Sequence, residues 1–140
     1  MGRIQDTFRI EMRRDLYKSY LAILESGQCD TQYEAIDRAR KSPAPQFYTT
    51  TKNCCYILGL MEQGKDTGLR NPDKIRKFVE LKRLADEWKE HEEYPGLINV
   101  CREIVNMPAP EYYICHNTAK QMILDERRRR QKEMMRWVKR

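Results

Sequence analysis

The residues best suited to chemistry are cations gathered at the C-terminal end of the sequence. Residues 127–140 hold eight basic side chains against a single acid, Glu133: these are Arg127, Arg128, Arg129, Arg130, Lys132, Arg136, Lys139 and Arg140. The net charge of this segment is 8 − 1 = +7, whereas that of the whole chain is +6. Residues 1–126 therefore have a net charge of 6 − 7 = −1. Because such cations neutralise phosphates, the segment predicts electrostatic binding of nucleic acid, whereas the body shows no general basic character.

Four residues outside this segment could contact bases. Lys52 and Asn53 begin one predicted helix, and Asn117 and Lys120 begin another. Each helix follows a turn and would be the third of a three-helix unit, the position of the helix that enters the major groove in helix-turn-helix proteins. The turn from residue 41 to 49 is longer than the usual three or four residues, and the helix surfaces lack base-reading arginines. We therefore expect most phosphate contacts to come from the C-terminal segment.

The cysteines and histidines do not form a pattern typical of metal binding or catalysis. Cys54-Cys55 and Cys115-His116 are adjacent pairs, and neighbours on a helix point in different directions. An odd total of five cysteines is consistent with reduced thiols, which act as small buried apolar groups. There is also no glycine-rich phosphate loop and no Ser/His/Asp signature. The sequence therefore predicts a protein that is not an enzyme and uses neither cofactor nor metal.

A repeated proline motif organises the elements that carry these residues. Pro43-Ala44-Pro45-Gln46-Phe47-Tyr48 recurs 65 positions later as Pro108-Ala109-Pro110-Glu111-Tyr112-Tyr113. Each proline fixes its own φ and pushes the preceding residue towards extended geometry, so the motif ends one helix and leads stiffly to the next. Apolar positions before and after the motif match at the same offset. The match predicts an internal duplication. In the first predicted helix, residues 6–26, the offset is 64 instead of 65, so that Tyr17 aligns with Leu81.

Apolar periodicity and capping residues predict an all-α protein of about six helices. Thr7, Thr31, Thr50 and Asn71 are candidate caps, with Thr49 and Thr51 as near-equal alternatives to Thr50, and Gly27 is a natural helix stop. The predicted helices span residues 6–26, 31–41, 51–63, 72–91 and 96–106, and a sixth runs from 116 or 117 to 138. The resulting organisation is a first three-helix unit at 1–63, a linker at 64–71, a second unit at 72–126 and a projecting basic helix at 127–140.

The repeated motif also resembles a known pattern. Pro43-Ala44-Pro45-Gln46-Phe47-Tyr48-Thr49-Thr50, followed by Cys54, is similar to the P-A-P-R-F-Y-V-S-x-x-x-A consensus of small uncharacterised Bacteroides-type proteins. The similarity covers about twelve residues in each half of the chain. It implies a helix-turn-helix-like unit and adds little about mechanism. Gln46 and Glu111 replace the consensus arginine, and Cys115 replaces the serine cap, so a phosphate contact made by that arginine would be absent here.

These features lead to two functional hypotheses. The first is a non-enzymatic nucleic-acid-binding protein, with phosphate contacts mainly from the arginine-rich C-terminal helix. The alternative is a protein–protein interaction or assembly module whose basic amphipathic tail, with Met134, Met135, Trp137 and Val138, docks on a partner or an anionic surface. No membrane span or signal peptide is apparent, so we expect a cytoplasmic protein. The sequence leaves its oligomeric state open.

Overall fold

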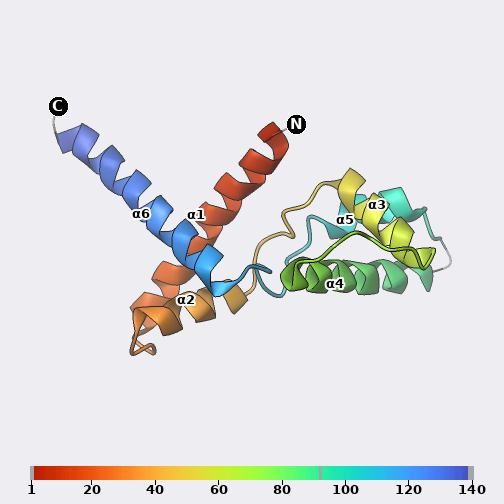
Figure 1. Ribbon diagram of the computed structural model, residues 1–140, viewed down its shortest axis with the longest axis horizontal. Helices are drawn as coiled ribbons and strands as arrows, with labels where there is room; N and C mark the ends of the chain where they lie inside the picture. Colours follow the sequence, from red (N-terminus) through yellow and green to blue (C-terminus); the bar gives the residue numbers. More distant parts are fainter. Residues whose placement is uncertain (1, 92, 139–140) are drawn as a thin grey trace. The chain divides into compact units, whose positions relative to one another are not determined.

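The computed structural model describes residues 2–91 and 93–138, and it confirms the all-α class (Figure 1). The described residues form six α-helices and no β-sheet: α1 (Gly2–Ser26), α2 (Gln32–Lys41), α3 (Thr51–Glu62), α4 (Pro72–Lys89), α5 (Leu97–Ile104) and α6 (His116–Val138). None of these helices, over the part of the chain that the structure describes, has the length and apolar content needed to cross a membrane.

Local capping chemistry sets the starts of three helices as expected. The Thr31 hydroxyl accepts from the backbone N–H of Glu34, and the Thr50 hydroxyl accepts from that of Asn53. The Asn71 side chain accepts from the N–H groups of residues 73 and 74, with Pro72 as the first residue of α4. Each cap satisfies N–H groups that have no partner within the helix, which explains why these boundaries could be read from the sequence.

Other helix ends differ from expectation, including that of α5, which lies at Ile104 rather than near residue 106. Helix α1 begins at Gly2 rather than near residue 6, so Thr7 lies inside the helix and is not its cap. No proline interrupts residues 2–7, and the helix continues through them. Helix α4 ends at Lys89, two residues before the expected end. Gly27, with φ of 67°, ends α1 in the left-handed conformation that glycine adopts without strain.

The helices group into two compact units, and this grouping differs from the expected division at 1–63 and 72–126. Unit 1 consists of the described residues within 1–44 and 110–140, so it contains α1, α2 and α6. Unit 2 consists of residues 45–109 and contains α3, α4 and α5. Each unit therefore combines two helices from one half of the sequence with the third helix from the other half. Residues 127–138 are not a separate segment, because they continue α6 of unit 1.

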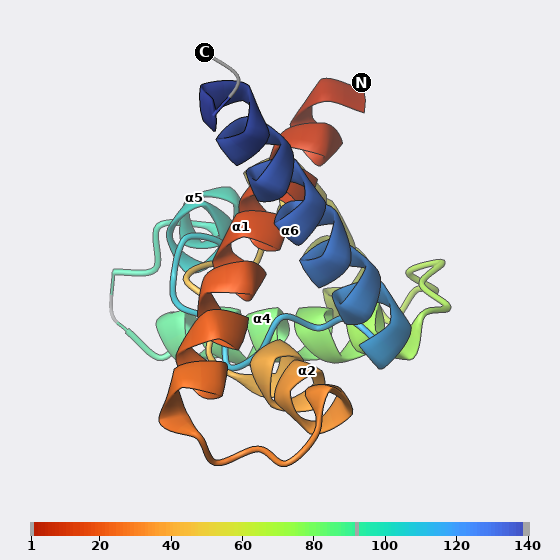
Figure 2. The same ribbon diagram turned by 90° about the vertical axis from the view of Figure 1, so that its left-hand side faces the viewer.

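In unit 1, α6 lies across α1 and also packs on α2 (Figures 1 and 2). The buried side chains of this unit include Leu16, Tyr20, Ile36, Ala39 and Ile123. The free ends of α1 and α6 diverge from the point where they cross, as both views show. The last residues of α6 therefore extend past the core.

In unit 2, α3, α4 and α5 pack against one another around a second core (Figure 1). The almost fully buried side chains of this unit include Leu58 of α3, Phe78 and Leu81 of α4, and Val100 and Ile104 of α5. The apolar stripes that the sequence predicts for these helices are thus largely confirmed. Some members of the stripes are nevertheless exposed: Leu24 in α1, Tyr33 in α2 and Ile75 in α4.

The two Pro-Ala-Pro segments have matching backbone conformations. Tyr48 and Tyr113 have φ of 55° and 57°, and they are the non-glycine residues with positive φ in the described chain. The N–H of Phe47 donates to the carbonyl of Val105 at 3.2 Å, and the N–H of Tyr112 donates to that of Arg40 at 3.0 Å. The division between the units falls within these segments, after Ala44 and after Ala109.

Candidate nucleic-acid interface

Helix α6 carries most of the predicted phosphate contacts, and its two parts have different environments. Ala119, Ile123 and Glu126 are fully buried against α1 and α2. Beyond Arg130, every described residue from 131 to 138 is exposed. We call residues 128–138 the arm. Helix α3 of unit 2 ends at Glu62, so the third helix of unit 1 has a long extension that the third helix of unit 2 lacks.

A buried acid, Glu126, fixes the base of the arm. Its carboxylate is fully buried and accepts from three guanidinium groups. Arg13 of α1 donates at 3.1 Å, Arg129 at 2.7 Å and Arg130 at 2.8 Å. Because three cations converge on one anion, the carboxylate is satisfied and the cluster remains positive overall.

The electrostatics of this cluster keep Glu126 ionised. Hydrogen bonds from Arg129, and then from Arg130, outweigh the effect of burial and lower the pKa of Glu126 from 4.5 to about 2. The pKa of Arg129 is raised in turn, mainly by its hydrogen bond to Glu126. Removing the acid would leave like charges close together at the helix junction.

Three of the four consecutive arginines are thus engaged within unit 1. Arg129 and Arg130 pair with Glu126, and the Arg130 guanidinium also lies 4.7 Å from the centre of the Tyr17 ring, a cation–π contact. Arg127 donates to the Tyr20 hydroxyl at 3.5 Å. Arg127 and Arg130 contact α1, whereas Arg129 pairs with Glu126 and Glu133 within α6. These three arginines are therefore less available to phosphate than we expected.

The remaining cations form a stripe along one side of the arm. Arg128, Lys132 and Arg136 recur every four residues, and none forms an ion pair with another residue that the structure describes. A rise of about 1.5 Å per residue places neighbouring members about 6 Å apart along the axis. Together with Gln131 and Met135 they line a shallow groove on the helix surface. We call Arg128, Lys132 and Arg136 the cationic stripe.

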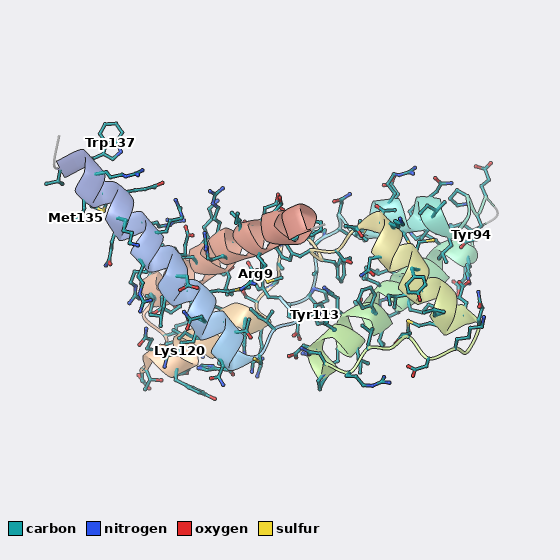
Figure 3. The ribbon with its side chains drawn as sticks, turned by 45° about the horizontal axis from the view of Figure 1, so that its top comes forward. Arg9, Tyr94, Tyr113, Lys120, Met135 and Trp137 are labelled. Carbon is teal, nitrogen blue, oxygen red and sulfur yellow. The ribbon has the colours of Figure 1, made fainter. Side chains whose placement is uncertain are left out.

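Apolar side chains also lie on the arm, with Met135 beside the cationic stripe and the others away from it. Met134, Met135, Trp137 and Val138 are 67%, 54%, 75% and 76% exposed. Met134 and Trp137 continue the helix face that buries Ala119, Ile123 and Glu126, since steps of three and four residues keep to one side of a helix. Figure 3 shows Met135 and Trp137 at the far end of α6. The arm is therefore amphipathic as well as basic.

The structure places the predicted base-contacting residues in separate settings. Asn117 and Lys120 are exposed near the start of α6 in unit 1, where Lys120 can be followed in Figure 3. Lys52 and Asn53 are exposed at the start of α3 in unit 2, and the Asn53 amide lies 3.4 Å from the Thr49 hydroxyl. Only Asn117 shares the side of α6 that carries the stripe, three turns before Arg128. Lys139 and Arg140 lie outside the described residues.

A helix-turn-helix formed by consecutive helices was also expected, and the structure pairs the helices differently. Helix α2 packs on α6, and α3 packs on α5. The helix that follows each Pro-Ala-Pro turn thus packs in a different unit from the helix that precedes it. This arrangement does not support a recognition helix held by the helix before it in the sequence.

Two of the five cysteines are buried as expected, whereas Cys29 and Cys55 are partly exposed and Cys115 is exposed. Cys54 and Cys101 are fully buried in unit 2, where a hydrogen bond to Cys101 and burial raise the pKa of Cys54. A thiol with a raised pKa is a poor nucleophile. In unit 1 the His116 ring stacks on Tyr33 with centroids 3.9 Å apart, and its Nδ1 lies 3.5 Å from Asp37.

Glu126 is the site residue that sequence reasoning missed. A signal was present, because an acid three and four positions before two arginines favours ion pairs on one side of a helix. That the same carboxylate is buried against Arg13, 113 positions away, follows only from the packing of α6 on α1.

Comparisons of the chain with protein-family models, curated proteins and solved structures give no significant match.

Proposed function

We propose that the protein binds nucleic acid through the phosphate backbone, using the arm of α6. The observation that carries the proposal is the cationic stripe: Arg128, Lys132 and Arg136 project along one side of an exposed helix without acidic partners among the described residues. Cations that are not already neutralised can release the counterions condensed on a nucleic acid, which is the main source of sequence-independent affinity.

Two features make the arm suitable for this role. The Glu126 cluster holds the base of α6 on α1, so the stripe is displayed on an ordered helix. The cluster itself adds positive charge at the base of the arm. Base reading would then be secondary, consistent with the absence of arginines among Lys52, Asn53, Asn117 and Lys120.

The test is a salt-titrated anisotropy measurement with a random-sequence duplex and a single strand. The variant R128A/K132A/R136A removes the stripe and should weaken binding uniformly across sequences. If each cation contacts one phosphate, the slope of log K against log salt should fall in magnitude by about 2 to 3.

A matched control removes the same charge elsewhere. Lys65, Lys74 and Arg102 are exposed cations of unit 2, and K65A/K74A/R102A should leave the slope almost unchanged. Equal losses for the two triple variants would mean that net charge alone drives binding. No loss for the stripe variant would contradict the proposal.

A second candidate function rests on the apolar side of the arm. Met134 and Val138 are 67% and 76% exposed, and a basic amphipathic helix of this kind is suited to a hydrophobic groove on an acidic protein. Such binding should be lost in M134A/V138A. Nucleic-acid binding should tolerate M134A/V138A, so the two variants separate the candidates.

A further inference from the structure

We propose that the chain consists of two copies of one three-helix repeat that exchange their third helices. Residues 1–63 would then be one partner and residues 72–138 the other. Each copy receives its third helix from the other copy, and residues 64–71 act only as a tether between them. This proposal concerns the assembly of the fold and does not depend on the proposed function.

The first support is the equivalence of the two connecting segments. A shift of 65 positions converts Tyr48 into Tyr113, whose φ angles differ by only 2°. At the same offset the donor Phe47 corresponds to the donor Tyr112, and the acceptor Arg40 corresponds to the acceptor Val105. The bonds observed are Phe47 to Val105 and Tyr112 to Arg40, so each copy donates to the other. Two identical units that swap an element make reciprocal contacts of this kind.

The second support is burial at equivalent positions. With a constant offset of 65, seven pairs of fully or almost fully buried residues fall on one another: Leu16 on Leu81, Tyr20 on Ala85, Ala35 on Val100, Ile36 on Cys101, Ala39 on Ile104, Cys54 on Ala119 and Leu58 on Ile123. The reduced offset of 64 expected for the first helix pairs Leu24, which is 44% exposed, with Trp88. The core therefore favours one offset for the whole repeat.

The third support is the set of contacts that join the two halves of the sequence. In unit 1, Arg13 bonds to Glu126, the Ser19 and Tyr112 hydroxyls lie 2.9 Å apart, and Arg40 donates to the carbonyl of Ile114. In unit 2, Lys89 bonds to Glu62. The first half supplies α1 and α2 to unit 1 and α3 to unit 2, and the second half supplies α4 and α5 to unit 2 and α6 to unit 1. Neither half alone therefore contains the three helices of one core.

The Pro-Ala-Pro motif explains why exchange occurs. A third helix packs on its own copy only if the preceding segment turns back, and prolines restrict the backbone to φ near −65°. The residue before each proline is also held in an extended conformation, which carries the chain away from the helix it leaves. A stiff, short connection is a known route to swapped arrangements.

The experiment uses the full chain with a protease site placed within residues 64–70. After cleavage, the two fragments should co-elute as a 1:1 complex with the helical content of the intact protein. Fragments that separate into two folded monomers, or into unfolded chains, would overturn the proposal.

Cross-linking then distinguishes exchange from simple side-by-side association. In the exchanged arrangement Tyr33 of α2 contacts His116, the first residue of α6. The corresponding first residue of α3 is Thr51, 65 positions earlier. If the third helices were not exchanged, Tyr33 would therefore face Thr51. In a C29S/C115S background, a short bis-maleimide should join the fragments of Y33C/H116C. The matched variant Y33C/T51C should show no link between residues 33 and 51.

Peptide mapping identifies the joined residues, and the background protein without new cysteines accounts for reaction at Cys54, Cys55 or Cys101. The opposite pattern, with 33 joined to 51 and not to 116, would show that each third helix packs within its own copy.

Discussion

At the scale of single residues, the buried acid Glu126 reduces the number of consecutive arginines that are available to bind a ligand. Four consecutive arginines in a sequence suggest a uniform phosphate-binding surface. Here Arg129 and Arg130 neutralise Glu126 together with Arg13, and Arg127 reaches Tyr20. Of the four, Arg128 is exposed, whereas the other three are partly buried. Charge available for a ligand therefore depends on which cations the fold itself uses.

We predict that E126Q destabilises the protein by about 3 kcal/mol at neutral pH, because it leaves three guanidinium groups around a neutral amide. The pKa of Glu126 is lowered on folding, so its stabilising contribution is present above pH about 4.5 and is lost as the pH falls towards 2. The difference between wild type and E126Q should shrink over that window. Urea unfolding at several pH values measures it.

The control is E133Q, which removes an acid that is 59% exposed and pairs only with Arg129 among the described residues. Its effect should stay below about 0.5 kcal/mol at any pH, as is usual for exposed ion pairs. A pH-independent difference for E126Q would contradict the ionised, buried carboxylate.

At the scale of elements, the helix caps differ between the two halves of the chain. Thr50 caps α3 through its hydroxyl, which accepts from the N–H of Asn53. The residue before α6 is Cys115, whose sulfur lies 3.2 Å from the Thr118 hydroxyl. A thiol is a weak acceptor, so α6 begins with a poorer cap than α3.

We predict opposite effects for substitutions at these two positions. T50A should destabilise the protein by about 1 kcal/mol through loss of the cap, and C115S should stabilise it by about 0.5 kcal/mol by replacing a weak sulfur acceptor with a hydroxyl. Thermal unfolding followed by circular dichroism measures both. C29S, in the loop between α1 and α2, is the control for replacing an accessible thiol and should have little effect.

At the scale of the whole molecule, the part of α6 that contributes to the core of unit 1 ends at Arg130, within the arm. Residues up to Arg130 contribute to the Glu126 cluster, whereas residues 131–138 are exposed. A division of the chain at residue 127 would cut through this cluster. The end of the charged run in the sequence does not coincide with the end of the structural core.

We predict that a chain ending at Arg130 keeps the stability of the full chain, because it loses no buried contact of the described structure. A chain ending at Glu126 should be less stable by about 2 to 3 kcal/mol, since Arg129 and Arg130 are removed from a buried carboxylate. Denaturant unfolding of both truncations measures the difference. Equal stabilities would show that the Glu126 cluster contributes nothing to the docking of α6.

Much of the local structure could be predicted from the sequence. Thr31, Thr50 and Asn71 cap helices as expected, and Gly27 ends α1, because caps and left-handed glycines depend on residues only a few positions apart. Apolar periodicity likewise predicted six helices and most of their buried faces. The start of α1 was misjudged because Thr7 is a good cap and nothing in the sequence prevents the helix from continuing past it.

The sequence by itself determined the helices, the repeated proline turns and the concentration of positive charge near the C-terminus. Only the tertiary structure decided which helices pack together and which cations remain exposed. The apolar stripes of α3 and α6 have similar spacing, so periodicity alone does not show which pair of helices each of them covers. The choice depends on where the stiff connecting segments direct the chain, and the burial of Glu126 against Arg13 follows from that choice.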